Sequence, residues 1–269
     1  MDKKVIFAIV AAVVIVVAAV GVYALLNNDS KSNDVTFLIQ DDKGVHFWLK
    51  GNGETSADAL ENAFSSYEDG TLIRSSYGIN TLFGMGSELD EETDQWSYWV
   101  QFTWIDNEWS YNNVGMNSIN SADVEYMLVL YGKGIMNDTP LPAGLPIPSS
   151  AKLWDGNTDG VVFTIESSTG LYFHVNGKGT TVYDAIKDAD SKYNLGFSGM
   201  AASLAENITM FNLSKSGGYA WEMYTVDDAG TGWDESSLPL GGLASAENSQ
   251  ICFKYNNGSL DIFAPVYAA

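Results

Sequence analysis

The spacing of oxygen-bearing side chains between positions 155 and 166 is the sharpest chemical signal in the sequence. Asp155, Asn157 and Asp159 alternate before Gly160, and Glu166 follows, which fits the calcium-loop pattern D-x-[DN]-x-[DN]-G-x5-E at every required position. Alternate side chains can converge on one cation while the glutamate closes the cage. The sequence therefore predicts a Ca²⁺ site at Asp155, Asn157, Asp159 and Glu166. The alternative is a polar turn, because a strand is predicted after Gly160, where an EF-hand has a helix.

A run of aromatic residues provides a second candidate site. Trp96, Trp99, Trp104 and Trp109 fall within one short segment that alternates like a strand, so Trp96 and Trp104 share one face and Trp99 lies on the other. A single helix cannot cover both faces, and exposed aromatic rings commonly bind sugars, flat ligands or proteins. We predict ligand-binding residues in both halves of the chain: Trp96, Trp99, Trp104, Trp221, Tyr224 and Trp233. The alternative is that these rings fill a core or an interface between domains.

Signals of catalysis are weak. The two histidines, His46 and His174, have no second ligand or nucleophile at a useful spacing, and no serine lies in a Gly-x-Ser-x-Gly turn. The single cysteine, Cys252, cannot form an internal disulfide. We therefore predict no enzymatic activity. Carboxylates from the acidic runs 88–94 and 227–235 would have to converge for the enzymatic alternative to hold.

The formal net charge of −21 restricts the partners of the chain. A field of that sign repels nucleic acid and anionic membrane surfaces. Nucleic acid is therefore excluded as an expected partner, whereas cations are attracted.

An internal repeat supplies the elements that position these residues. Residues 35–60 recur without a gap at 161–186, with the glycines in register. Each copy predicts two strands joined by a turn, a Gly-x-Gly, and a helix that starts at a [ST]-x-x-[DE] capping signal. Later tryptophan-containing and apolar strands also repeat, at offsets of 122 to 124. The predicted fold class is α+β, with a mostly antiparallel sheet packed on one helix in each copy.

The segments outside the repeat predict a membrane anchor and a linker. Val5–Leu26 is uncharged and almost entirely apolar, which suits a helix that spans a bilayer with about 20 residues. We predict a transmembrane anchor at 1–27, with a cytoplasmic N-terminus and extracytoplasmic domains; a cleaved signal peptide is the alternative. The remaining predicted parts are a stalk at 28–33, domain 1 at 34–133, a proline-rich linker at 134–159 and domain 2 at 160–269.

The repeat resembles a known domain family. The stretch Gly179–Ile186 and the strand Trp221–Tyr224 are similar to motifs of the β-grasp domain of the transcobalamin carboxy-terminal type. The resemblance covers both copies and implies extracellular modules that bind a ligand, such as a corrinoid. The Asn-Gly hairpin that usually follows the tryptophan strand in this family is missing here, at 106–108 and at 227–230. The chain therefore departs from the family at the place where its corrinoid contacts would be expected.

These features together predict a membrane-anchored binding protein at the cell surface. Its partner would be a small molecule, with a corrinoid suggested only by the family. The alternative is a structural or adhesive module that recognises a surface protein or glycan. A groove between the copies with inward-facing tryptophans would favour the receptor, whereas independent domains with packed tryptophans would favour adhesion.

Overall fold

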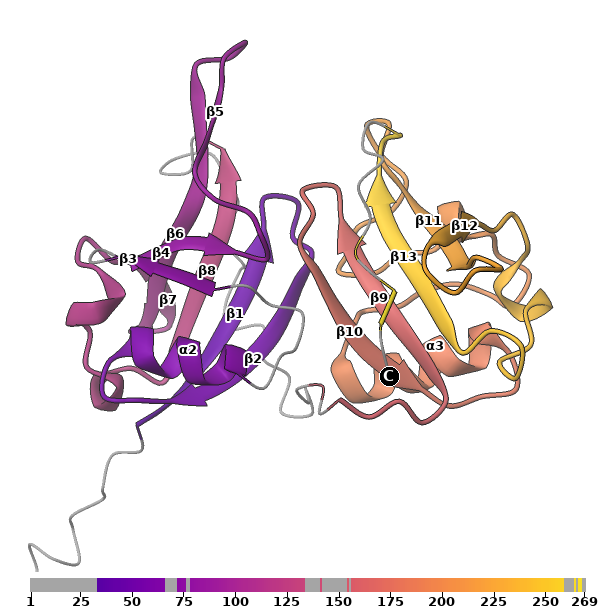
Figure 1. Cartoon of the computed structure of the whole chain (residues 1–269), viewed down its shortest axis with the longest axis horizontal. Coiled ribbons are helices and arrows are strands. Elements are labelled where there is room, and N and C mark those ends of the chain that lie inside the picture. The colour runs from indigo at the N-terminus through magenta and orange to yellow at the C-terminus, as the bar shows by residue number, and fades with distance from the viewer. Residues whose placement is uncertain are drawn as a thin grey trace, which may run out of the picture. The chain divides into compact units, whose positions relative to one another are not determined.

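Each copy of the repeat is built around one mixed β-sheet in the computed structural model of the chain (Figure 1). The structure describes residues 33–65, 72–75, 78–133, 141, 154, 156–258, 264 and 266–267. In both sheets the first two strands form an antiparallel hairpin, and the last strand of the copy lies parallel to the first. The repeat seen in the sequence is therefore a repeat of sheet topology.

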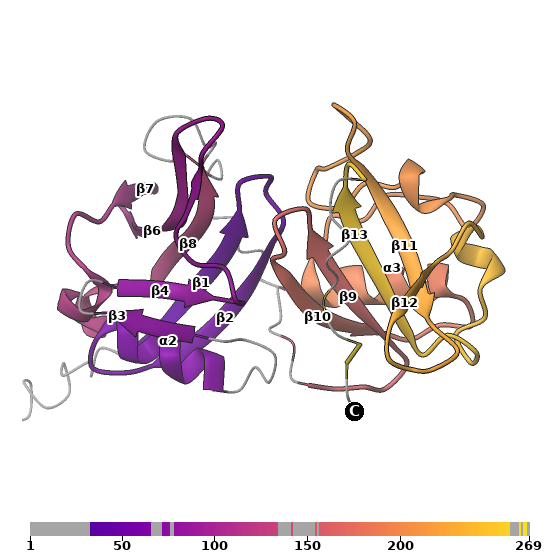
Figure 2. The same cartoon turned by 45° about the horizontal axis from the view of Figure 1, so that its top comes forward.

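In the first copy the sheet order is β2-β1-β8-β6-β5, with β7 pairing β6. One helix packs on this sheet (Figure 2), and a separate two-stranded sheet, β3-β4, follows it in the chain. The elements are β1 (Asp34–Asp41), β2 (His46–Asn52), α2 (Ser56–Ser65), β3 (Leu72–Ser75), β4 (Gly78–Leu82), β5 (Glu88–Asp90), β6 (Gln95–Ile105), β7 (Glu108–Tyr111) and β8 (Tyr126–Lys133).

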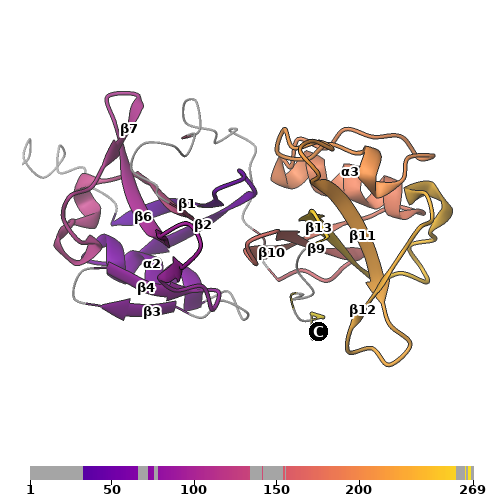
Figure 3. The ribbon, with the colours of Figure 1, turned by 90° about the horizontal axis from the view of Figure 1, so that it is seen from above.

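In the second copy the order is β10-β9-β13-β11-β12. Figure 3 shows α3 on one side of these strands. The elements are β9 (Val161–Ser167), β10 (Tyr172–Gly177), α3 (Val182–Tyr193), β11 (Ala220–Val226), β12 (Trp233–Glu235) and β13 (Gln250–Asn256).

The Gly-x-Gly of each copy allows its helix to approach the sheet closely. A Cβ on Gly51 would lie 1.9 Å from the carbonyl oxygen of Ala59, and one on Gly177 would lie 1.9 Å from that of Ala185. The helix after the second pair has Thr181 as its N-cap, and the side chains of Thr181 and Asp184 form a complete capping box. The repeated sequence thus encodes both the start of the helix and its distance from the sheet.

The two faces of each sheet differ in what they bury. The face that meets the helix is apolar in both copies and joins them in one continuous buried core. The opposite face of the first sheet carries an apolar cluster that includes Leu38, Phe102 and Leu130. On the second sheet the equivalent positions are polar, with Thr164, Tyr224 and Lys254. The two copies therefore bury similar apolar residues on the helix-facing side of the sheet and different residues on the opposite side.

The predicted fold class is wrong. Most of the regular secondary structure among the described residues is β-strand, and α2 and α3 are short helices of 10 and 12 residues. The long strand β6 and the extra pair β3-β4 shift the balance toward β-structure.

The prediction of a single-pass membrane protein is also corrected. Among the residues that the structure describes, no helix is long and apolar enough to cross a membrane. The apolar run Val5–Leu26 lies outside those residues, as do most of the predicted stalk and linker.

Candidate functional site

Equivalent residues of the two copies meet at the junction between β2 and β10. Phe47 and Phe173, which occupy the same place in the repeat, stack with ring centroids 5.2 Å apart and an interplanar angle of 18°. Contact between the same residue of two copies is the mark of a two-fold interface. The copies therefore associate as a pseudo-symmetric pair inside one chain, within the compact unit 34–269.

A second pair of phenylalanines extends this symmetry. Phe83 and Phe211 both have a φ of +53°, and each lies edge-on to the hairpin of the other copy. Phe83 contacts Tyr172 at 5.4 Å between centroids, and Phe211 contacts His46 at 4.8 Å. Aromatic rings from both copies therefore alternate across the junction.

Trp99 and Trp221 hold the turns that present these phenylalanines. The Trp99 indole donates a hydrogen bond to the carbonyl oxygen of Met85 at 2.8 Å, and the Trp221 indole donates to that of Leu213 at 3.0 Å. Met85 and Leu213 each close the tight turn that carries Phe83 or Phe211. These two predicted ligand residues therefore position the junction from the core.

A pocket opens at this junction. Its walls come from both copies and consist mainly of aromatic rings, and the space amounts to about 430 Å³ including its opening to solvent. The aromatic lining residues are His46, Phe47, Trp48, Trp154, Phe173, His174, Tyr193 and Phe211, with Leu49, Val175 and Leu195 between them. The lining thus includes both histidines of the chain and two tryptophans.

The protonation state of His46 can be assigned from its surroundings. Its Nδ1 lies 2.9 Å from the carbonyl oxygen of Gly44, which can only accept, so Nδ1 carries the proton. Burial lowers the pKa of His46 below its usual value and outweighs the opposing effect of that hydrogen bond. The imidazole is therefore neutral near pH 7, and its Nε2 is an acceptor at the pocket.

His174 is held by a different partner. Its Nδ1 lies 3.1 Å from Oγ1 of Thr164, and its ring contacts Trp154 and Tyr267 at centroid distances of 5.3 and 5.2 Å. This histidine is buried, with 1% of its surface exposed. It forms an ordered polar spot in an otherwise apolar wall.

The other predicted ligand residues lie apart from the pocket. Trp96 is 52% exposed at the start of β6, and Trp104 packs edge-on against Trp109 at 5.0 Å. The Tyr224 hydroxyl donates to Glu222 at 2.7 Å, and the Trp233 indole donates to the carbonyl oxygen of Ala264 at 2.8 Å. None of the six predicted residues lines the pocket.

The predicted calcium ligands are not brought together among the residues described. Asn157 Oδ1 accepts the backbone N–H of Asp159, and the Asp159 carboxylate pairs with Lys178 at 3.3 Å. Glu166 lies near the far end of β9, roughly 17 Å along the strand from its first residue at about 3.3 Å per residue. Asp155 falls outside the described residues, among which no cluster of three or more metal-binding side chains occurs.

The pocket residues were missed because they look like core residues in the sequence. Phe47 and Phe173 alternate correctly for the helix side of their strands, and nothing local shows that they also meet each other. One signal was available: an identical large aromatic residue near the start of both edge strands. Identity across a divergent repeat can indicate a shared interface as well as a shared core.

No protein-family model, no curated protein and no solved structure matches this chain. Its class is therefore defined by its own geometry: a two-copy β-sheet module with an aromatic pocket at a pseudo-two-fold junction.

A buried carboxylate also lies at this junction. Oδ1 of Asp41 accepts the backbone N–H groups of Lys43, Gly44 and Val45 at 2.8 to 3.0 Å, and its Oδ2 accepts the Thr169 hydroxyl of the other copy at 3.2 Å. Burial, with the neighbouring charge of Asp42 as the next cause, raises the pKa of Asp41 to about 6.

The substitution Asp41→Asn is expected to stabilise the protein at neutral pH. Asp41 resists ionisation when folded, so the wild type loses stability as the pH rises from about 4 to about 6. An asparagine keeps an acceptor for the backbone without this penalty. The gain at pH 7 should be about 2–3 kcal/mol and should vanish near pH 4. Urea unfolding of both proteins across this pH range measures it.

Asp227→Asn is the matched control for this prediction. Backbone hydrogen bonds, first that of Thr231, lower the pKa of this exposed turn aspartate, so its replacement should destabilise the protein at neutral pH. A pH-independent difference between Asp41→Asn and the wild type would contradict the assignment.

Proposed function

We propose that this protein is a non-catalytic binding module that holds a compact aromatic ligand in the pocket between its two copies. The observation that carries the proposal is the aromatic lining that both copies give to one pocket, with the stacked Phe47 and Phe173 and with Trp154 among its residues. Binding sites are commonly apolar concavities with a few placed polar groups, and this description fits the pocket. An aromatic pocket that both copies line favours a receptor over a pair of independent adhesive domains.

The size and polarity of the pocket define the ligand class. The void reaches about 430 Å³ only when its opening to solvent is included, so the enclosed part is small and only a compact ligand can enter it. A corrinoid macrocycle with its side chains is too large for such a space. The neutral His46 offers an acceptor, so a flat ligand that carries one hydrogen-bond donor fits best.

The family resemblance contributes to this proposal only at the level of topology. In each sheet the hairpin strands lie at one side and the last strand lies parallel to the first, as in a β-grasp domain of the transcobalamin carboxy-terminal type. This similarity supports a ligand-binding module. It does not support a corrinoid as the ligand.

Indole is the probe that tests the proposal. Titration calorimetry of the full chain should detect indole binding, and benzothiophene, which has the same shape without the N–H, should bind about tenfold more weakly because His46 would lose its donor. The substitution Val175→Phe, which fills the pocket from its wall, should abolish binding. A corrinoid should produce no heat.

Trp96→Ala is the matched control, because Trp96 is exposed and does not line the pocket. This variant should bind indole like the wild type, and circular dichroism should show that Val175→Phe is folded. If indole does not bind, or if it binds Val175→Phe equally well, the proposal is wrong.

A second candidate function is recognition of a protein or glycan by the first copy. Trp96, Ile105 and Tyr111 are 52%, 50% and 46% exposed on β6 and β7, and exposed aromatic residues are typical anchors of such contacts. For this alternative, Trp96→Ala rather than Val175→Phe should reduce binding in a glycan array.

A further inference from the structure

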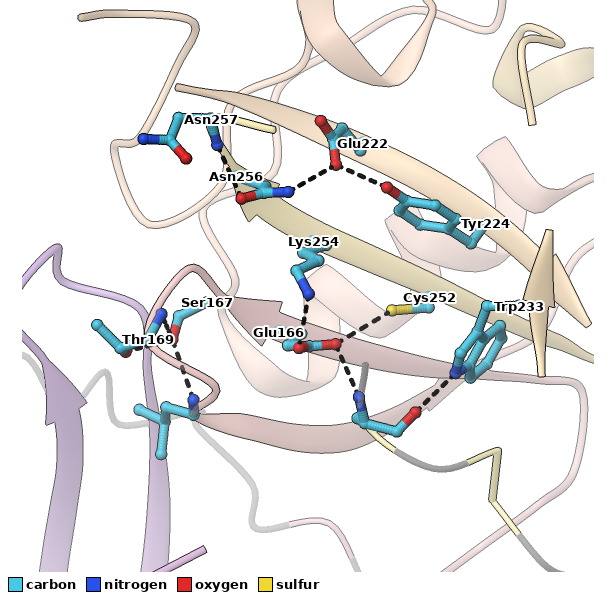
Figure 4. Close-up of polar contacts among 12 residues, drawn as sticks. Glu166, Ser167, Thr169, Glu222, Tyr224, Trp233, Cys252, Lys254, Asn256 and Asn257 are labelled. Atoms are coloured by element: carbon cyan, nitrogen blue, oxygen red, sulfur yellow. Dashed lines mark hydrogen bonds and ion pairs between the residues drawn. The ribbon is translucent and has the colours of Figure 1, made fainter. Parts of the chain in front are cut away.

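An ion pair is buried on the second sheet, on the face opposite the helix. Lys254 Nζ lies 3.0 Å from Glu166 Oε1, and their side chains are only 1% and 2% exposed. The two residues are direct partners on the parallel strands β13 and β9. Figure 4 shows the lysine directed at the carboxylate from the neighbouring strand. Strand pairing thus holds the lysine nitrogen in contact with the carboxylate where solvent is excluded.

The second oxygen of Glu166 is held by the C-terminal segment. Oε2 accepts the backbone N–H of Ala264 at 3.0 Å, and the Ala264 carbonyl oxygen in turn accepts the Trp233 indole N–H at 2.8 Å (Figure 4). A fixed backbone donor at a carbonyl oxygen is the arrangement that stabilises negative charge developing there.

We propose that Lys254 and Glu166 condense to an intramolecular amide that joins β13 to β9. A proton first passes from the ammonium to the carboxylate, which leaves an amine and a carboxylic acid. The Nζ lone pair adds to Cδ, the C–N bond forms, and the π pair moves onto Oε2, facing the Ala264 N–H. Collapse of this intermediate breaks the Cδ–Oε1 bond, and Oε1 leaves as water with the acid proton and one proton from nitrogen.

Burial supplies the conditions for this step. Charged groups are costly to keep away from water, and burial raises the pKa of Glu166 against the opposing effects of Lys254 and of the Ala264 N–H. Protonation of the Glu166 carboxylate, with which the condensation begins, is thereby made easier. Holding the two groups in contact replaces a bimolecular encounter, and the absence of solvent opposes hydrolysis of the product.

The neighbouring groups do not compete for the reaction. Cys252 Sγ lies 4.0 Å from Glu166 Oε2, but burial raises the pKa of this thiol, so it stays protonated and is a poor nucleophile. Glu222, opposite Lys254 on β11, accepts hydrogen bonds from Tyr224 and Asn256. Glu166 is therefore the residue that supplies the acyl group of the amide.

The first copy provides an internal negative control. Gln40 and Leu130 are partners on β1 and β8, at the places that Glu166 and Lys254 occupy in the second copy. Leu130 has no amine, so the proposal predicts one amide per chain and none in the first sheet.

The mass of the denatured full chain tests the proposal. The purified wild type should be lighter than its sequence mass by one water molecule, and tandem mass spectrometry of a digest should find a branched peptide joining Glu166 to Lys254. Glu166→Gln should reach the same cross-linked mass by losing ammonia. Lys254→Arg, which keeps the charge but lacks the reactive amine, should show its full mass.

The wild-type measurement decides the proposal even if a variant does not fold. A wild type of full sequence mass after prolonged incubation in the folded state would overturn it. A mass deficit without the branched peptide, or one that persists in Lys254→Arg, would also overturn it, because dehydration would then lie elsewhere.

Discussion

Replacing Gly177 by alanine is expected to destabilise the second copy strongly. The added Cβ would lie 1.9 Å from the carbonyl oxygen of Ala185 and 2.8 Å from the backbone nitrogen of Ala189. Both are backbone atoms of α3, so no side-chain rotation can relieve the overlap, and β10 and α3 must separate. Overpacking of flexible cores costs about 1–3 kcal/mol, and this rigid contact should cost more than about 3 kcal/mol. Urea unfolding followed by tryptophan fluorescence measures the loss.

Gly217→Asn is the matched control for that substitution. Gly217 has a φ of +58° with nothing within 4 Å of an added Cβ, and asparagine tolerates this left-handed conformation. The control should therefore lose less than about 1 kcal/mol. Gly51→Ala should reproduce the large effect in the first copy, where the clash with Ala59 is equally short. An unfolding free energy of Gly177→Ala within 1 kcal/mol of the control would refute the close-packing argument.

The residues on the helix-facing side of each sheet could be predicted because the same apolar alternation occurs in both copies of the repeat. Alternation assigns Val35 and Phe37 to one face of β1, and Val161 and Phe163 repeat that assignment on β9. The capping box at Thr181 is likewise local, since all its atoms lie within one turn of helix. Signals of this kind need no knowledge of the rest of the chain.

The pocket could not be predicted, because it depends on contacts between distant segments. Alternation shows which residues share a face but not what covers that face. The sequence predicts Trp99 and Trp221 as ligand-binding residues, whereas in the structure each indole donates to the carbonyl oxygen of a turn that the sequence does not reveal. The junction needs Phe47 and Phe173 to meet, and only the association of the copies brings them together.

Glu166 shows how a local pattern can mislead. Its distance from Asp159 in the sequence fits a calcium loop, but β9 is extended and carries the carboxylate away from that loop. Its actual partner, Lys254, comes from a strand that pairs with β9 only in the folded sheet. A carboxylate whose burial depends on such a distant amine has no signature in the sequence around it.

Removing the amine alone is expected to be far more harmful than removing both charged groups. Lys254→Leu leaves Glu166 buried without its cation, and breaking a buried ion pair from one side costs about 3–5 kcal/mol. Adding Glu166→Gln recreates the Gln40–Leu130 pair that the first copy accommodates at the same place, so the double variant should recover more than half of the loss. Urea unfolding at pH 7 compares the two variants.

The pH dependence of the single variant separates charge burial from poor packing. Without Lys254, the pKa of Glu166 rises further, so the folded state takes up a proton and Lys254→Leu should regain stability as the pH falls toward 5. The double variant has no such carboxylate and should not show this gain. Equal stability of the two variants at every pH would mean that the lost packing of the lysine chain, rather than the unpaired charge, dominates. Neither variant retains the amine. The difference between their free energies of unfolding therefore measures the cost of burying the unpaired carboxylate, whether or not the wild type carries an amide.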